Sequence, residues 1–152
     1  MDYLAIKKQL HSKCKEQAQQ RLDNIQKSVN AVQDAANLET RSTAGDKYDT
    51  SRSMMHLEQE KLAKQLSDAK ASFQAIDQLD PNKTYDKVTH GSLAITTGGN
   101  LYFSVSIGKV DLEGETYFAL SGAAPLANVL MGLKVGETGV FNGKKYKVLA
   151  VV

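Results

Sequence analysis

The first half of this 152-residue chain has almost no helix-breaking residues. No proline occurs before Pro81, and Gly45 is the only glycine before that point. Because Gln, Lys, Ala and Glu dominate this half, the sequence predicts long helices there. Ten of the eleven glycines come later, together with Val, Thr, Tyr and Phe, a mixture that favours strands and tight turns. We therefore expect a helical part, residues 1–80, and a β-rich part, residues 81–152.

Other absences limit the class of protein. Cys14 is the only cysteine, which excludes an internal disulfide and fits a reducing compartment. No apolar run approaches the ~20 residues that cross a bilayer, and the N-terminus lacks the basic-then-apolar order of a signal peptide. A net charge of +2 is too small to indicate non-specific nucleic-acid binding. We expect a cytoplasmic, monomeric protein that contacts no membrane.

The three histidines and the single cysteine do not predict a zinc site or a catalytic nucleophile. His11, His56 and His90 have no ligand spacing to Cys14, so a zinc site is not predicted. Cys14 lies four residues before Ala18, on the upstream continuation of the apolar seam of the first helix, and is expected to be a small core residue rather than a nucleophile.

Two heptad-like patterns occupy the helical part. In the first helix apolar residues are spaced 4-3-4-3-4, and in the second they continue from residue 48 to residue 76. Residues 39–45 interrupt the pattern with turn formers. A break this short between helices of similar length predicts an antiparallel hairpin whose tip is residues 40–46. An alternative is a dimerisation coiled coil with an unimportant loop. The seam positions are Ala18, Leu22, Ile25, Val29, Val32 and Ala36, and Tyr48, Met55, Leu62, Leu66, Ala69, Phe73 and Ile76.

Alternating residues predict strands in the second part. Leu101, Phe103, Val105 and Ile107 would share one face of a strand, with Tyr102, Ser104 and Ser106 opposite. Further strands are expected over residues 116–120 and 146–152, with an Asn-Gly hairpin turn at residues 142–143. Pro125 suits the first position of a short helix that stops at Gly132. The fold class is thus α+β: an antiparallel two-helix coiled coil followed by a small, mostly antiparallel sheet with one short helix.

This order of parts resembles the Gre-type bacterial transcript cleavage factors, in which an antiparallel coiled coil precedes an FKBP-like β domain. Three segments carry the resemblance. Gly45-Asp46-Lys-Tyr-Asp49 is similar to the family's Gly-Asp-x-x-Glu at the tip. Ala123-Ala-Pro-Leu-Ala-Asn-Val-Leu-Met-Gly-Leu-Lys-Val-Gly-Glu137 is similar to its Ser-Pro-leading helix and the following turn. Lys145-Tyr-Lys-Val-Leu-Ala-Val151 is similar to its last strand.

The resemblance implies that the hairpin enters the secondary channel of bacterial RNA polymerase. There Asp46 and Asp49 would help hold a Mg²⁺ shared with the polymerase, near the RNA 3′ end of a backtracked complex. Mg²⁺ often takes only one or two protein carboxylates, so the chain alone should bind no cofactor stably. Arg41, Tyr48 and Arg52 near the tip, and Pro125 and Lys134 in the β domain, are the residues expected to contact partners. The chain would be an accessory factor, with catalysis belonging to the polymerase.

Each of these residues could instead have a purely structural role, without any contact to metal or partner. Asp46 could cap the second helix, and Asp49 in its first turn would suit the helix dipole. Arg41 and Arg52 could simply solvate a loop, and Tyr48 could pack in the seam. The basic residues of the first helix are expected to form a solvated surface, with a weak guide toward RNA as the minority interpretation; they are Lys7, Lys8, Lys13, Lys15, Arg21 and Lys27.

Departures from the family pattern keep other functions open. After Asp49 comes Thr-Ser-Arg-Ser-Met-Met instead of the usual Asn-Ala-Glu-Tyr, and Ala124 stands where the family has Ser. Family relatives with altered tips bind polymerase without promoting cleavage, so a regulator of that kind is one alternative. A coiled-coil scaffold unrelated to polymerase is another. Prolyl isomerase activity is a third, but no aromatic-lined pocket is expected from the strands.

Overall fold

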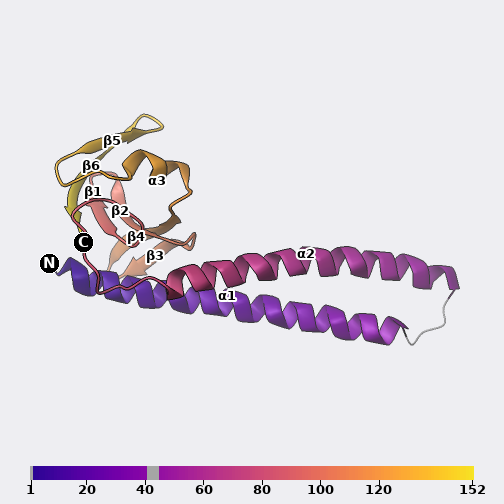
Figure 1. Cartoon of the computed structure of the whole chain (residues 1–152). Helices are drawn as coiled ribbons and strands as arrows, with labels where there is room; N and C mark the ends of the chain where they lie inside the picture. Colours follow the sequence, from indigo (N-terminus) through magenta and orange to yellow (C-terminus); the bar gives the residue numbers. More distant parts are fainter. Residues whose placement is uncertain (1, 41–44) are drawn as a thin grey trace. The chain divides into compact units, whose positions relative to one another are not determined.

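The computed structural model describes the backbone of residues 2–40 and 45–152, and the side chains of residues 2–38 and 52–152. It contains two long helices, α1 (Tyr3–Thr40) and α2 (Gly45–Asp77), followed by a six-stranded sheet and a short helix (Figure 1). The α+β prediction is confirmed. The chain divides into two compact units, residues 1–17 with 74–152 and residues 18–73. Among the described helices, none has the length and apolarity needed to cross a membrane.

Within the unit of residues 18–73, the described residues 18–40 and 45–73 form the paired part of the helices, which run antiparallel as predicted (Figure 1). The seam is uneven. Ala18, Leu62 and Ala69 are buried, whereas the seam positions from residue 22 to residue 36 are half-buried. Around a Gln59–Gln33 side-chain hydrogen bond of 3.3 Å the helices leave a groove of about 220 Å³ lined mainly by Val and Leu side chains. Small and β-branched residues along the seam leave this space unfilled.

The start of α1 shows why this helix begins where it does. The Asp2 carboxylate accepts a hydrogen bond from the backbone N–H of Ala5 at 3.1 Å, so Asp2 serves as the N-cap. The next four turns are buried over a broad arc that includes Ile6, Leu10 and Cys14. Such an arc is wider than a two-helix seam requires, because this stretch also packs on the sheet.

The sheet has the strand order β3-β4-β2-β1-β6-β5. All neighbouring pairs are antiparallel except β2 and β4, which are parallel. The mostly antiparallel sheet predicted from the alternation is therefore confirmed. The strands are β1 (Leu93–Thr96), β2 (Gly99–Ser104), β3 (Gly108–Leu112), β4 (Glu115–Ser121), β5 (Thr138–Phe141) and β6 (Lys144–Val151), with α3 (Pro125–Leu130) between β4 and β5.

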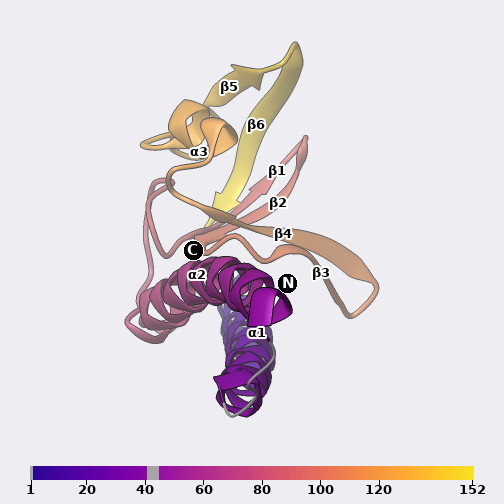
Figure 2. The same ribbon diagram turned by 90° about the vertical axis from the view of Figure 1, so that its right-hand side faces the viewer.

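Both faces of β2 are covered, which the alternating pattern did not predict. Leu101 and Phe103 face the core under α3, and Tyr102 faces α1, yet all three are almost fully buried. Figure 2 shows α3 on one side of strands β1, β2 and β4, and the His11–Tyr102 hydrogen bond places α1 on the other side. The expected continuation of the strand to Ile107 is wrong, because a tight turn in which the Ile107 N–H bonds to the Val105 carbonyl follows β2.

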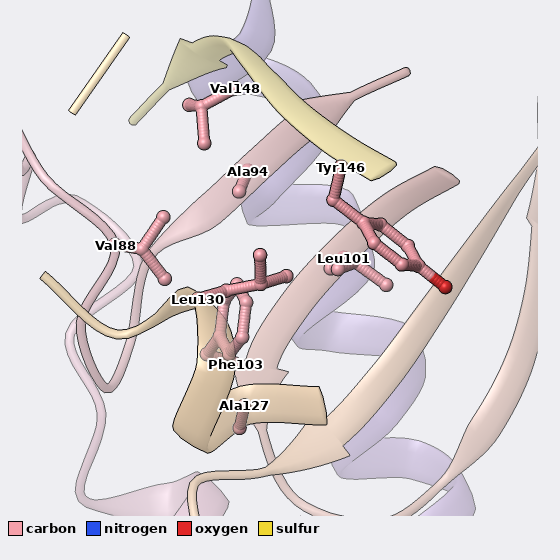
Figure 3. Packing of buried hydrophobic residues seen from close by; sticks show 8 residues of the cluster. All are labelled: Val88, Ala94, Leu101, Phe103, Ala127, Leu130, Tyr146 and Val148. Atoms are coloured by element: carbon pink, nitrogen blue, oxygen red, sulfur yellow. The ribbon is translucent and has the colours of Figure 1, made fainter. Parts of the chain in front are cut away.

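The core between the sheet and α3 draws on three strands, β1, β2 and β6, together with α3 and the segment before β1. It comprises Val88, Ala94, Leu101, Phe103, Ala127, Leu130, Tyr146 and Val148 (Figure 3). The short helix begins at Pro125 as predicted and ends at Leu130, two residues before Gly132, which has a φ of +83°. Ala124 precedes it without a side-chain cap hydrogen bond. The Asn142-Gly143 turn has positive φ at both residues, 51° and 77°, which is the primed turn expected from that dipeptide.

Candidate functional site

The backbone places the two tip aspartates at the start of α2. The helix begins at Gly45, one residue before Asp46, so Asp46 lies inside the first turn rather than at the N-cap position. Asp49 follows three residues later in the same helix, which puts both residues on one side of it. Negative charge in a first turn is stabilised by the helix dipole. The side chains of Asp46 and Asp49 lie outside the described residues.

The other predicted contact residues fall in both units. Arg41 and the side chain of Tyr48 lie outside the described residues, and Arg52 is exposed on α2. Pro125 is the first residue of α3 and Lys134 follows that helix; both side chains are exposed. The Lys134 N–H donates to the Glu137 carboxylate at 2.9 Å, which fixes the turn after α3. In the described parts of the chain no three His, Cys, Asp or Glu side chains are grouped to hold a metal ion. The metal role of Asp46 and Asp49 thus stays a prediction.

Lys7 corrects the expectation of a wholly solvated basic surface on α1. This side chain is fully buried. Its Nζ donates to the carbonyl of Lys83 at 2.6 Å and to that of Val152 at 3.1 Å, and it lies 4.7 Å from the ring centroid of Tyr85. Two charge-assisted hydrogen bonds and a cation–π contact offset the cost of burying an ammonium group. Lys7 therefore ties the start of α1 to the chain's last residue.

His11 and Tyr102 continue this buried polar strip. The His11 Nδ1 and the Tyr102 hydroxyl are joined by a hydrogen bond of 3.0 Å. Burial, helped by the charge of Lys15, lowers the pKa of His11 below its usual value, so the imidazole is neutral at pH 7. Burial also raises the pKa of Tyr102. Lys7 and His11 were missed because they are polar, although each follows a buried apolar residue, Ile6 or Leu10, and so extends the same arc.

The pH dependence of stability should report the burial of Lys7. Burial lowers the pKa of Lys7 to about 8 from 10.5, partly opposed by Asp80. Between these values the folded state releases a proton that the unfolded state keeps, so this group makes stability rise with pH. The unfolding free energy of the wild type minus that of Lys7→Met should increase above pH 8 by up to about 1.4 kcal/mol per unit. Urea denaturation from pH 7 to 10 measures it.

The neighbouring exposed Lys8 supplies the control for this measurement. Lys8→Met changes the same residue type one position along α1, on its solvent side, and its difference from wild type should stay flat with pH. A flat Lys7→Met difference would instead mean that the two carbonyls hold the ammonium charged throughout.

Cys14 should be inert in the folded protein. Its side chain is fully buried, and burial raises the pKa of the thiol to about 11. Because the thiolate is the reactive form, reaction with a disulfide reagent such as Ellman's reagent at pH 8 should be slower than that of the urea-unfolded chain by at least about 100-fold. Equal rates in the two states would contradict the burial. The expected role of Cys14 as a core residue agrees with its burial.

The β unit, the compact unit of residues 1–17 and 74–152, carries a groove that corrects another expectation. Beside α3, Phe118 and Tyr146 contribute to the lining of a groove of about 390 Å³. No aromatic-lined pocket was expected from the alternating strands. The two residues are 28 positions apart, and only the strand order brings β4 and β6 to the sides of one groove.

Comparison with known proteins gives structural neighbours alone. No family model matches the chain, and no curated protein sequence matches it. Among solved structures it is similar to the transcription factor Gfh1, with 16% identity, a TM-score of 0.34, and 91% of this chain and 92% of that chain covered. It is also similar to GreA factor homolog 1 of Thermus thermophilus, with 13% identity, a TM-score of 0.34, and coverage of 91% and 94%. Identities this low leave the function to be argued from the chain's own residues.

Proposed function

We propose that this chain is a Gre-like transcription elongation factor. In this proposal the FKBP-like β domain binds bacterial RNA polymerase, and the hairpin tip enters the secondary channel. There the tip assists cleavage of backtracked RNA by the polymerase, and the chain itself is not an enzyme. The observation that carries the proposal is the Gly45-Asp46-x-x-Asp49 segment at the first turn of α2, directly after the break in an antiparallel hairpin.

The carboxylates suit the metal that such cleavage uses. Asp46 and Asp49 share one side of a helix and offer oxygen ligands, which Mg²⁺ prefers, and one or two protein carboxylates are its usual share. When bound, Mg²⁺ would stabilise charge on the attacking and leaving oxygens. The role of this chain's residues is to bring negative charge to a metal that the polymerase also holds. Two carboxylates alone are too few for stable binding, so the metal should bind only in the complex.

A regulator that binds the same channel without promoting cleavage is the second candidate. The segment after Asp49 favours it, because Thr-Ser-Arg-Ser differs from the family's usual Asn-Ala-Glu-Tyr and places Arg52 in the first turns of α2. A cation there could pair with a tip carboxylate and compete with the metal. Both candidates require polymerase binding and differ only in cleavage.

Competition for polymerase tests what both candidates share. A labelled Gre factor bound to core RNA polymerase should be displaced by this chain, measured as a fall in fluorescence anisotropy. Pro125→Ser and Lys134→Glu should weaken the displacement, whereas Asp46→Ala should not. If the chain fails to displace the factor and does not bind polymerase directly, the scaffold alternative replaces the proposal.

A further inference from the structure

The sheet face that carries α3 is only partly covered by that helix. Next to Leu126 of α3 the face remains open and forms the groove of about 390 Å³. A space of this size lies in the range of small-molecule sites. Its lining includes Gly98, Leu101, Phe118, Leu126, Lys144 and Tyr146.

The walls of the groove are apolar and aromatic. Phe118 is 44% exposed although it is a large apolar residue on a sheet face. Figure 3 shows the Tyr146 ring beside Leu101 at the edge of the core cluster, with its hydroxyl directed away from Val148. Gly98 permits this ring position, because a Cβ at residue 98 would lie 2.3 Å from Tyr146 Cδ1. Such walls favour a flat apolar ligand body.

One positively charged side chain, that of Lys144, lines this groove. Lys144 is the only charged residue in its lining. Its Nζ donates to the Gly98 carbonyl at 3.0 Å and lies 5.4 Å from the Tyr146 ring centroid, so two neighbours hold it in place. An ammonium has three N–H donors, and the carbonyl takes one. Across the described side chains, no ion pair involves Lys144, and residues 138–152 contain no Asp or Glu. The positive charge is therefore available to a ligand.

We propose that this groove binds a small apolar carboxylate. The apolar body would lie between Phe118 and Tyr146, and the carboxylate would accept hydrogen bonds from the Lys144 ammonium. The same chemistry can come from a free aromatic acid or from the C-terminal end of a peptide whose last residue is apolar. This inference does not depend on polymerase binding, because ligand binding to the groove is measured on the chain alone.

Paired acid and amide probes test the proposal on the full chain. The ¹⁵N-labelled protein is titrated with 2-naphthoate and with neutral 2-naphthamide, and amide chemical shifts are followed by NMR. Shifts should centre on the groove, at residues such as Gly98, Leu101 and Phe118. Because an exposed ion pair contributes modestly, naphthoate should bind about 3- to 5-fold more tightly than naphthamide.

Two lysine variants on β6 separate a specific contact from general attraction. Lys144→Met should abolish the preference for the acid, whereas Lys147→Met, an exposed lysine on the same strand outside the groove, should leave it intact. A short peptide ending in Phe, as acid and as amide, shows which source binds more tightly. The proposal is wrong if shifts occur away from the groove or not at all, if acid and amide bind equally, or if both lysine variants lose the preference equally.

Discussion

Replacing Asp46 or Asp49 by alanine should reduce stimulated RNA cleavage by at least about 10- to 100-fold, while polymerase affinity changes little. Removing a residue that only hydrogen-bonds a metal ligand reduces metal affinity or activity by about 10- to 100-fold. Each aspartate would be a direct ligand, so its loss should cost at least as much. The measurement is the rate of RNA shortening in stalled polymerase complexes at a fixed Mg²⁺ concentration. Raising Mg²⁺ should partly restore cleavage, because the variants weaken metal binding rather than docking.

Asp68→Ala is the matched control, since Asp68 is an exposed aspartate on the same helix outside the tip. It should cleave as the wild type does. Wild-type chain that binds polymerase but cleaves nothing would favour the regulator, and aspartate variants with full activity would remove the metal role altogether.

Phe103→Ala should destabilise the β unit by about 3–5 kcal/mol. The Phe103 side chain is fully buried in the core under α3, and its backbone N–H and carbonyl are both hydrogen-bonded, to Ser92 and Gly91. Substitution therefore removes a ring without letting the strand shift to fill the cavity. Because domains are stable by only about 5–15 kcal/mol, much of the margin would be lost. Urea denaturation followed by circular dichroism measures it.

Phe118→Ala provides the comparison for this measurement. Phe118 lies on the same sheet face, but it is 44% exposed, so its truncation should cost less than about 1.5 kcal/mol. Equal losses for the two variants would show that the core is not where the structure puts it.

Local signals were sufficient to predict much of the fold. The low Gly and Pro content predicted both long helices, and Pro125 predicted the start of the short one, which ends two residues before Gly132. The Asn142-Gly143 pair predicted its hairpin because these residues alone favour positive φ there. Strands β1 and β3 were not predicted. Each has only four or five residues, too few to show a clear alternation of apolar and polar residues. Their extended conformation is set by hydrogen bonding to the neighbouring strands.

Tertiary contacts decide what the sequence could not show. From the sequence, Lys7 is expected to be a solvated residue on a helix. It can be buried because the carbonyls of Lys83 and Val152, which are remote in sequence, both accept hydrogen bonds from its ammonium group. The groove likewise needs β4 and β6 in one sheet. For the tip, in contrast, the sequence is more informative than the structure: the spacing of Asp46 and Asp49 and the family resemblance identify them as candidate site residues. Their role remains a prediction, since the described residues show only the helical backbone beneath them.

The position of the tip in a polymerase complex tests the central claim most directly. Because Cys14 is buried, a Lys47→Cys variant offers one reactive thiol, to which an iron chelate that generates hydroxyl radicals can be attached. In a backtracked complex we expect cuts in the RNA near its 3′ end, and these cuts should disappear when excess unlabelled chain is added. Full binding with cuts only on the outer surface of the polymerase, or with none in the RNA, would contradict delivery of the tip to the active centre.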